Sequence, residues 1–396
     1  MTPNFPKEPE AKRAMLLEAV AAIGPILSAQ GGRSEELNTL APAAVSALRD
    51  TGMFKLKLAS EMGGAEADPL TEMLVLEELA YHDLTSGWCT MVGATAIASL
   101  GTFLPQSGLD KVFGNGQVPT ASISFFPAGQ ATRKDTGGYR VSGRWRFNSG
   151  IRHSDWVLGG TVVLNSDNGH GGPIVMFSAF PARDVTLHDN WGGVTGLRGT
   201  GSVDFSVEDY DLPEDQTFVW DLLHPKPLRG GPSYRLPPFS YVAKEHGSVA
   251  LGGARRALDE LVKIATTTRG TFRSSKLDER QVVHRFIGEA DLKLRAARAL
   301  MHERYGQLWR KVNAGEEPDG PDIADVRAIC VYATDVAIEV ATMAYHFAGN
   351  TGLHHPHVIG RLLRDINTAG IHQVMSDTAY ENHGKYRLGL PADPLA

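Results

Sequence analysis

A continuous apolar seam between residues 326 and 347 limits what the chain can form there. Its members, separated by alternating steps of three and four residues, are Val326, Ile329, Ala333, Val336, Val340, Met343 and Phe347. Such spacing places every member on one face of an α-helix. Because a helix with so long an apolar face has to bury it against other helices, the seam predicts a helical bundle. A second seam predicts a partner helix and consists of Ala290, Leu294, Ala297 and Met301.

The middle of the chain has a different periodicity. Short runs rich in β-branched and aromatic residues, such as "GGYRVSGRWRFNSG", "SDWVLGGTVV" and "GSVDFSVED", are separated by glycine-rich turns. We therefore expect an antiparallel β domain between two helical regions. The expected divisions are an N-terminal helical domain (1–114), the β domain (115–223), a Pro/Gly-rich linker (224–238) and a C-terminal helical bundle (239–396).

Two local signals mark helix ends in the N-terminal region. Asp68 directly precedes Pro69, so the aspartate is placed to cap a helix that begins at the proline. Gly31 and Gly32 follow an Ala- and Leu-rich run, and this pair is expected to end the first helix.

Charge and cysteine content exclude several classes of function. The net charge is -6 and no basic block is present, so we expect neither nucleic acid nor a membrane surface as a partner. No uninterrupted apolar run reaches the roughly 18 residues of a membrane span. Cys89 and Cys330 match no zinc or redox spacing, and "HHPH" (354–357) has no suitably spaced cysteine or carboxylate, so no metal site is expected. The absence of a signal-peptide core favours a cytoplasmic protein.

Four segments, in the same order along the chain, resemble the acyl-CoA dehydrogenase superfamily. They are "TGMFKLKLASEMGGAEADPLTEMLVLEELAYHDLTSGW", "YRVSGRWRFNSG", "GLRGTGSVDFSVEDYDLPED" and "HGSVALGGARRALDELV". The resemblance implies a mainly α fold with a central antiparallel β domain, between an N-terminal helical domain and a C-terminal four-helix bundle. It also implies a flavin where these regions meet and assembly into a tetramer or dimer, of which we expect the homotetramer.

The dehydrogenases of this superfamily use a carboxylate to remove a proton next to a thioester carbonyl. Many of them carry it late in the bundle, and in "RDINTAGIHQVM" the corresponding residue is Gln373. An amide cannot act as that base. Some members place the base at the start of the bundle, where Glu245 lies in "VAKEHGS", so an FAD-dependent acyl-CoA dehydrogenase with Glu245 as base remains an alternative.

The flavin-dependent monooxygenases of the same fold show a closer resemblance. Oxygenase components such as p-hydroxyphenylacetate and dibenzothiophene monooxygenases carry "SGRW-F-SG" and, near the C-terminus, "RD--TA--H". Both patterns occur here, at Ser142–Gly150 and Arg364–His372. The resemblance implies that reduced flavin (FMN or FAD) from a separate flavin reductase reacts with O2 through a C4a-hydroperoxyflavin. The substrate would be a small or polycyclic aromatic, a heterocycle or an amine. Phenol hydroxylases of this branch often carry a histidine where Ile97 stands here.

The same resemblance nominates site residues. Ser149 is expected to meet flavin N5 and His372 to act on the peroxide or the substrate as a hydrogen-bond donor or base; the alternatives are a strand-end serine and a helix-end histidine. Expected cofactor contacts are Ser122, Ser124, Ser149, Trp88, Arg269, Gly349 and Asn350. Gly349 and Asn350 would reach the flavin of a neighbouring subunit, or else form a helix end and a turn. A flavin-fold protein that binds or assembles without catalysis is a third hypothesis.

Overall fold

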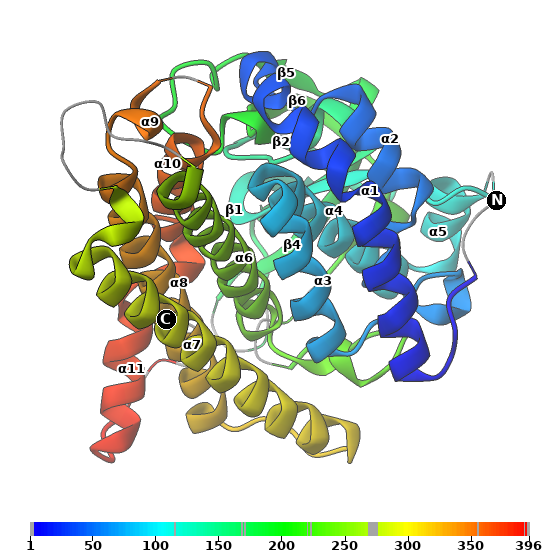
Figure 1. Ribbon diagram of the computed structural model, residues 1–396. Helices are drawn as coiled ribbons and strands as arrows, with labels where there is room; N and C mark the ends of the chain where they lie inside the picture. Colours follow the sequence, from blue (N-terminus) through cyan, green and yellow to red (C-terminus); the bar gives the residue numbers. More distant parts are fainter. Residues whose placement is uncertain are drawn as a thin grey trace.

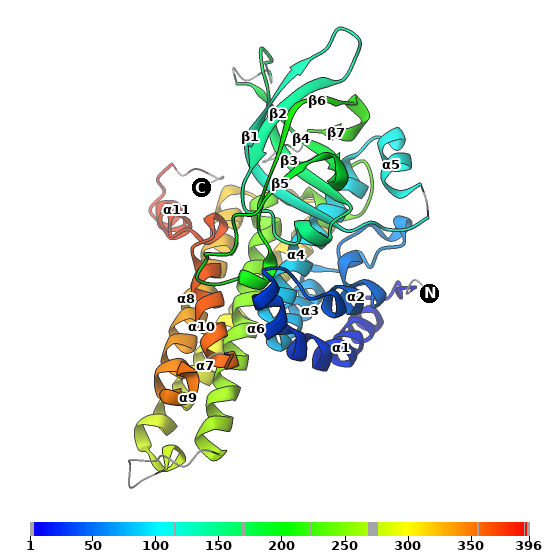
Figure 2. The same ribbon diagram turned by 90° about the horizontal axis from the view of Figure 1, so that it is seen from above.

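The computed structural model describes residues 4–114, 116–167, 169, 172–219, 221, 224–267, 276–354, 356–391 and 393. In this part of the chain two groups of helices, separated in sequence by the strands, pack beside one β-sheet (Figure 1). Figure 2 shows the sheet at one end of the molecule and the long C-terminal helices extending away from it. The architecture confirms a mainly α fold whose strands come between two helical regions in the sequence.

The N-terminal helices surround one nearly uncharged helix. They are α1 (Pro9–Leu37), α2 (Pro42–Asp50), α3 (Pro69–His82), α4 (Leu84–Phe103) and α5 (Gln106–Phe113). The predicted start of α3 is confirmed, because Asp68 Oδ1 accepts from the backbone N–H groups of Leu70 and Thr71, each at 3.1 Å. All but one residue of α4 are buried, as expected of a small-residue helix with no charged side chain.

The predicted end of α1 at the glycine pair is wrong. The helix continues to Leu37 and ends where Asn38 adopts a left-handed conformation with φ 51°. Gly31 lies inside the helix, at a position where a Cβ would lie 2.5 Å from both Arg361 Nη2 and Asp83 Oδ1. The glycine therefore serves close packing rather than chain reversal.

The C-terminal helices form the predicted bundle. They are α6 (Pro238–Thr267), α7 (Gln281–Asn313), α8 (Gly320–Ala348), α9 (Asn350–Leu353), α10 (Val358–Gly370) and α11 (Thr378–Arg387). Helices α6, α7, α10 and α11 all pack against α8. The seam on α8 is buried from Val326 to Val340, whereas Met343 and Phe347 are half-buried. All four members of the α7 seam are buried.

Within the described residues the strands form one seven-stranded sheet, in the order β5-β6-β2-β1-β3-β4-β7. They are β1 (Ala121–Arg133), β2 (Tyr139–Trp145), β3 (Trp156–Val163), β4 (Ile174–Pro181), β5 (Thr186–His188), β6 (Asp204–Leu212) and β7 (Thr217–Phe218). The sheet is mixed, so the expectation of an antiparallel domain needs correction. After β2 the chain crosses to the far side of β1, and β3 therefore pairs with β1 in parallel.

Glycines in three strands make room for one indole. A Cβ at Gly129, Gly143 or Gly159 would lie 2.2 to 2.9 Å from the ring of Trp145. The indole Nε1 donates to the carbonyl of Gly160 at 2.6 Å, and its ring stacks on Phe205 with centroids 4.8 Å apart. The tryptophan of the "SGRW" run is thus a core residue that fixes the end of β2, directly before the turn that carries Ser149.

Two helices reach the length and hydropathy of a membrane span, although neither contains an uninterrupted apolar run of about 18 residues. They are α1 and α8, with mean hydropathies of 1.4 and 1.3 over their most apolar windows. For α8, 61% of that window is buried in the protein, as in the core helix of a bundle, and for α1 the share is 33%. Two such helices are weak evidence for a membrane protein. The expectation that the protein has no membrane partner stays a prediction.

Candidate active site

The first turns of α4 bring Trp88 against the sheet. Asp83 caps this helix, its Oδ2 accepting from the N–H of Ser86 at 2.9 Å and from the Thr85 hydroxyl at 2.8 Å. Trp88 follows one turn later, is 4% exposed, and donates its indole Nε1–H to Ser149 Oγ at 3.0 Å. Two of the predicted site residues, from distant parts of the sequence, are therefore in direct contact.

The turn that carries Ser149 is held by the segment before β6. Phe147 and Gly150 adopt left-handed conformations with φ 62° and 77°. Asn148 N donates to the carbonyl of Val203 at 3.2 Å and Gly150 N to that of Thr200 at 2.9 Å. These bonds fix the Ser149 side chain between α4 and the 200–203 segment.

Two buried hydroxyl groups continue from Ser149 into the protein. Ser149 Oγ lies 2.7 Å from Ser202 Oγ, which lies 2.6 Å from Thr200 Oγ1. Thr200 Oγ1 in turn donates to the carbonyl of Leu197 at 2.7 Å. Neither Ser202 nor Thr200 was among the residues that the sequence nominated.

Two imidazoles face Trp88. The ring of His246, on α6, lies 5.1 Å from the indole, and the ring of His372 lies 5.7 Å from it, both roughly edge-on. The two imidazole centroids are 4.6 Å apart. The predicted His372 thus meets the predicted Trp88, and the unpredicted His246 contacts both.

Hydrogen bonds define which ring nitrogen carries the proton in each imidazole. His246 Nδ1 lies 3.0 Å from the carbonyl of Val242, which can only accept, so Nδ1 is protonated. His372 Nδ1 accepts from the N–H of Val374 at 3.2 Å, so the hydrogen of its neutral ring is on Nε2. His372 therefore caps the short 3-10 helix Gln373–Met375 and presents an N–H donor from its other nitrogen.

Both imidazoles are held neutral. Burial lowers the pKa of His246 to about 4, and the nearby Lys57 cation contributes in the same direction. Desolvation by the surrounding protein, with a smaller contribution from His246, lowers the pKa of His372 to about 3. His372 nevertheless remains exposed to solvent, because it lines a recess at the protein surface.

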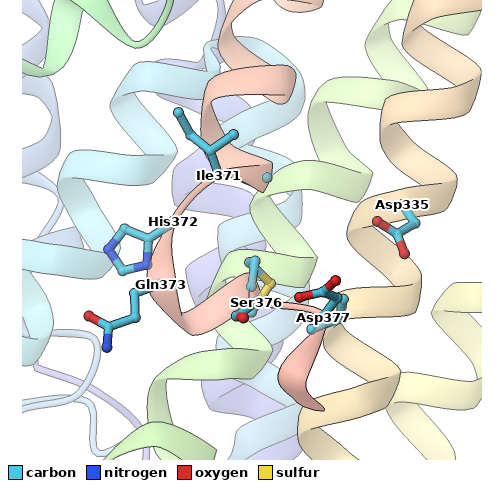
Figure 3. A pocket seen from close by; sticks show the side chains of 9 residues that line it. Asp335, Ile371, His372, Gln373, Ser376 and Asp377 are labelled. Carbon is cyan, nitrogen blue, oxygen red and sulfur yellow. The ribbon is translucent and has the colours of Figure 1, made fainter. Parts of the chain in front are cut away.

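A cavity of about 430 Å³ adjoins His372. It is lined by Val331, Asp335, Gly370, Ile371, His372, Gln373, Met375, Ser376 and Asp377. Figure 3 shows the His372 and Gln373 side chains on one side of this segment and Asp335, from α8, on the other. Gln373, which stands where a dehydrogenase carries its late glutamate, is thus exposed beside His372.

Glu245 is committed to a buried ion cluster. Its Oε1 pairs with Lys57, and its Oε2 accepts from the hydroxyl of Thr95 at 3.3 Å. Lys244 Nζ lies 2.8 Å from Glu72 Oε2 and 3.6 Å from Glu245 Oε1. All four charged side chains are at most 2% exposed, and their charges sum to zero. Glu245 is therefore not an unpaired base facing a substrate.

The predicted serines of β1 lie beside the Ser149 turn. Ser122 Oγ donates to the backbone carbonyl of Ser149 at 2.9 Å, and Ser124 Oγ donates to that of Arg146 at 3.4 Å. Both serines are buried, so in this structure they support the turn. Their direct contact with a cofactor stays a prediction.

The remaining nominated residues lie elsewhere. Arg269 lies outside the described residues, as does His355 of the "HHPH" run. Gly349 and Asn350 are exposed at the junction of α8 and α9, which Figure 2 shows at the end of the bundle far from the sheet. Within one chain they lie far from Ser149, and their contact with a neighbouring subunit's flavin stays a prediction.

His357 caps α10, its Nδ1 accepting from the N–H of Ile359 at 3.2 Å. Among the described residues there is no group of three metal-binding side chains.

The Arg-Asp pair of the C-terminal pattern connects distant segments. Arg364 pairs with Glu35 on α1, and Asp365 Oδ1 accepts from the N–H of Leu197 at 2.6 Å. Burial raises the pKa of Asp365 to about 7. Asp365 therefore holds the start of the segment that supplies Thr200 and Ser202, whereas Thr368 packs close to Gly196.

The sequence carried weak signals for the residues that were missed. His246 follows Glu245 directly in "AKEHGS", but a single histidine in a helix gives no indication of which neighbour it faces. Ser202 and Thr200 stand in "RGTGS", which reads as a turn. Their contact with Ser149 depends on the pairing of β6 with β2, which brings the segment before β6 beside the turn after β2.

Comparison with known families matches both helical regions. Residues 27–103 match the family described as "Acyl-CoA dehydrogenase, N-terminal domain", and residues 245–377 match "Acyl-CoA dehydrogenase, C-terminal domain".

Individual proteins match over most of their length. The chain is 29% identical over 346 residues to an indole-3-acetate monooxygenase of Pseudomonas putida, covering 87% of this chain and 86% of that one. It is 27% identical over 384 residues to a flavin-dependent monooxygenase, oxygenase subunit HsaA, of Rhodococcus jostii, and the match covers 95% of this chain and 98% of that one. The structure of XiaF from a Streptomyces species in complex with FADH2 and glycerol superimposes with a TM-score of 0.85 at 25% identity, over 97% of each chain.

Proposed function

Because the chain belongs to the acyl-CoA dehydrogenase superfamily, in its branch of two-component flavin-dependent monooxygenases, we propose that it hydroxylates an aromatic or heteroaromatic ring with one atom of O2, while the other atom leaves as water. The chain is an oxidoreductase, the oxygenase component, and its cofactor is reduced flavin. A flavin reductase supplies that flavin. The homotetramer and the cytoplasmic location are kept as predictions.

One observation carries the choice between oxygenase and dehydrogenase. Glu245, which the dehydrogenase hypothesis requires as a base, has both carboxylate oxygens occupied by Lys57 and Thr95. The groups around Trp88 are instead neutral imidazoles. Removal of a proton next to a thioester needs a basic group with access to it. The side-chain hydrogen-bond and ring partners described above for Trp88 and Ser149 are hydroxyl groups and imidazoles.

The groups around Ser149 fit a reduced flavin. Flavin N5 carries a hydrogen in the reduced form, and a serine hydroxyl can accept from it. The indole edge of Trp88 and the turn at Ser149 would hold the ring system, with Ser122 supporting the turn from β1. When bound, reduced flavin supplies the electrons that activate O2 for transfer of one oxygen atom to the substrate.

His372 supports this chemistry as a donor. Because its Nδ1 is occupied by the Val374 N–H, the Nε2–H is the group it offers to the recess. A preset N–H aimed at a developing negative charge on oxygen stabilises it without rearrangement. This assignment selects hydrogen-bond donation from the two roles that the sequence left open for His372.

The substrate class follows from the relatives and the recess. One relative is an indole-3-acetate monooxygenase, which supports a heteroaromatic ring. At the position where related phenol hydroxylases often place a histidine, Ile97 is fully buried. We therefore rank indoles and other heteroaromatics first for screening, followed by polycyclic aromatics, phenols and aromatic amines.

Incorporation of labelled oxygen tests the proposal. The purified protein, a flavin reductase, NADH and flavin are incubated under ¹⁸O2 with the substrate panel. We expect a product that contains one ¹⁸O atom, with formation dependent on reduced flavin. Anaerobic bleaching of bound oxidised flavin by an acyl-CoA, without any reductase, would overturn the proposal in favour of the dehydrogenase.

A further inference from the structure

A chain of buried hydroxyl groups leads away from Ser149. It runs from Ser149 through Ser202 to Thr200, with oxygen separations of 2.7 and 2.6 Å, and ends at the carbonyl of Leu197. Ser149, Ser202 and Thr200 are 6%, 4% and 0% exposed. Solvent water therefore cannot substitute for a missing partner along this chain, which we call the hydroxyl relay.

The direction of every bond in the hydroxyl relay follows from its two ends. The carbonyl of Leu197 can only accept, so the proton of Thr200 points to it. A hydroxyl has one proton, and the short contact between Thr200 and Ser202 must therefore use the proton of Ser202. The contact between Ser202 and Ser149 then uses the proton of Ser149. This is the one assignment in which every short contact is a hydrogen bond.

The other end of the relay agrees with this direction. The indole Nε1–H of Trp88 can only donate, and it donates to Ser149 Oγ. Ser149 thus gives its proton to Ser202 and uses one lone pair for Trp88. One lone pair remains, so toward a ligand the hydroxyl is an acceptor and not a donor.

The terminal carbonyl is held in place from several sides. Trp191 Nε1 donates to it at 3.1 Å, and the N–H of Leu197 itself donates to Asp365 at 2.6 Å. Leu197 adopts a left-handed conformation with φ 53°, and the surrounding bonds maintain it. The direction of the relay is therefore built into the fold before any ligand binds.

We propose that Ser202 and Thr200 are positioning residues that hold Ser149 as a hydrogen-bond acceptor and thereby make the site favour reduced over oxidised flavin. N5 of reduced flavin carries a hydrogen that Ser149 can accept, whereas N5 of oxidised flavin offers only a lone pair. This inference rests on the proposed function, in which Ser149 meets N5. It adds two residues that touch neither flavin nor substrate and that act through Ser149.

Thr200→Val reverses the relay in this scheme. Valine keeps the shape of threonine but has no hydroxyl, so Ser202 loses its acceptor and turns its proton to Ser149. Ser149 then no longer donates to Ser202, and its hydroxyl proton can point toward N5. The fold is little affected, because Leu197 O still accepts from Trp191 and from the backbone N–H of residue 200.

The measurement is a ratio of dissociation constants. Oxidised flavin is titrated in air and reduced flavin under argon, each followed by tryptophan fluorescence. For Thr200→Val we expect the ratio of the oxidised to the reduced constant to fall about tenfold, because one hydrogen bond is lost with reduced flavin and one is gained with oxidised flavin. Thr200→Ser, which restores the hydroxyl, is expected to restore the ratio.

Two further variants make the test independent of local damage. Ser202→Ala removes the acceptor of the Ser149 proton directly. Ser149 keeps a free lone pair for reduced flavin and gains a free proton for oxidised flavin, so we expect a smaller fall in the ratio than for Thr200→Val, and the same fall in the double variant as in Ser202→Ala. Thr90→Val is the matched control, because Thr90 is buried on α4 and donates only to the carbonyl of Ser86 at 2.8 Å. Its ratio is expected to stay at the wild-type value.

The possible outcomes distinguish a failure of this inference from a failure of the proposed oxygenase function. If the wild-type protein binds neither form of flavin, the proposed function fails and the inference fails with it. If reduced flavin binds but folded Thr200→Val and Ser202→Ala keep the wild-type ratio, the relay is overturned and the oxygenase assignment stands. If one variant does not fold, the other decides.

Discussion

Successive residues of α6 face two buried regions of opposite character. Lys244 and Glu245 enter the ion cluster, where positive and negative side chains neutralise each other without solvent. His246, the next residue, faces Trp88 and His372, where burial keeps the ionisable groups uncharged. On one face of α6 the buried side chains are charged and paired, and on the other face the buried imidazole is uncharged. The neutral face adjoins an exposed recess at His372, and this arrangement indicates where uncharged substrates can bind.

The largest expected effect breaks the charged region. Lys57→Met keeps a long side chain but leaves Glu245 without its closest cation. We expect the free energy of unfolding in urea to fall by about 3–5 kcal/mol, because an uncompensated buried charge is strongly destabilising. Adding Glu245→Gln should recover much of the loss. A decrease below about 1 kcal/mol in the single variant would show that the cluster is not a coupled unit.

His372→Asn tests the neutral region. Asparagine can still accept from the N–H of Val374 at the cap, but it lacks the Nε2–H. We expect the yield of hydroxylated product per reduced flavin to fall at least about tenfold, with the balance appearing as H2O2, because a positioned donor or acid contributes that much or more.

A matched control separates the two roles of this histidine. His357→Asn makes the same substitution at a histidine that caps α10 in the same manner. Its product yield should equal that of the wild-type protein. Equal yields in the two variants would remove His372 from the reaction.

The next effect concerns pH. The folded pKa of His246, about 4, lies below the ordinary value of about 6.5, so on acidification the unfolded chain takes up this proton first. The stability associated with a neutral His246 is therefore complete above pH 6.5 and is lost as the pH falls toward 4, by up to about 1.4 kcal/mol per pH unit. In His246→Phe this contribution is absent. If the free energy of unfolding falls equally in the wild-type protein and in His246→Phe between pH 7.5 and 5, the assignment of a lowered pKa to His246 is contradicted.

The smallest effect concerns the carboxyl group beside the relay. Because burial raises the pKa of Asp365 to about 7, Asp365→Asn at pH 6 replaces a largely uncharged group and keeps the acceptor for Leu197 N–H. We expect a change in unfolding free energy below about 1 kcal/mol, against about 1–3 kcal/mol for Asp365→Ala, which leaves a buried N–H without a partner. Equal losses in the two variants would exclude a role for the acceptor.

Features that depend on local chemistry could be predicted from the sequence. The Asp68–Pro69 helix start and the seams of α7 and α8 follow from capping and from helical periodicity, and the structure confirms them. The resemblance in turn supplied Ser149, Trp88 and His372 together, and these three are in contact through hydrogen bonding or ring packing.

Features that depend on contacts between distant segments could not. Gly31 reads as a helix stop, and only the approach of Arg361 and Asp83 explains why it lies inside α1. The parallel pair of β1 and β3 depends on the path of the chain between β2 and β3, which periodicity does not encode. Glu245 was a candidate base until Lys57, 188 residues away in sequence, was placed beside it.

The bond between His372 Nδ1 and the backbone at Val374 has a thermodynamic consequence. A ring whose tautomer is set by the main chain, and whose pKa lies far below neutrality, exchanges no proton with the medium when a substrate arrives. Calorimetric heats of substrate binding at pH 7.5 should therefore contain no contribution from proton exchange at His372, and the dependence of the heat on buffer ionisation enthalpy should be the same in wild-type protein and in His372→Asn.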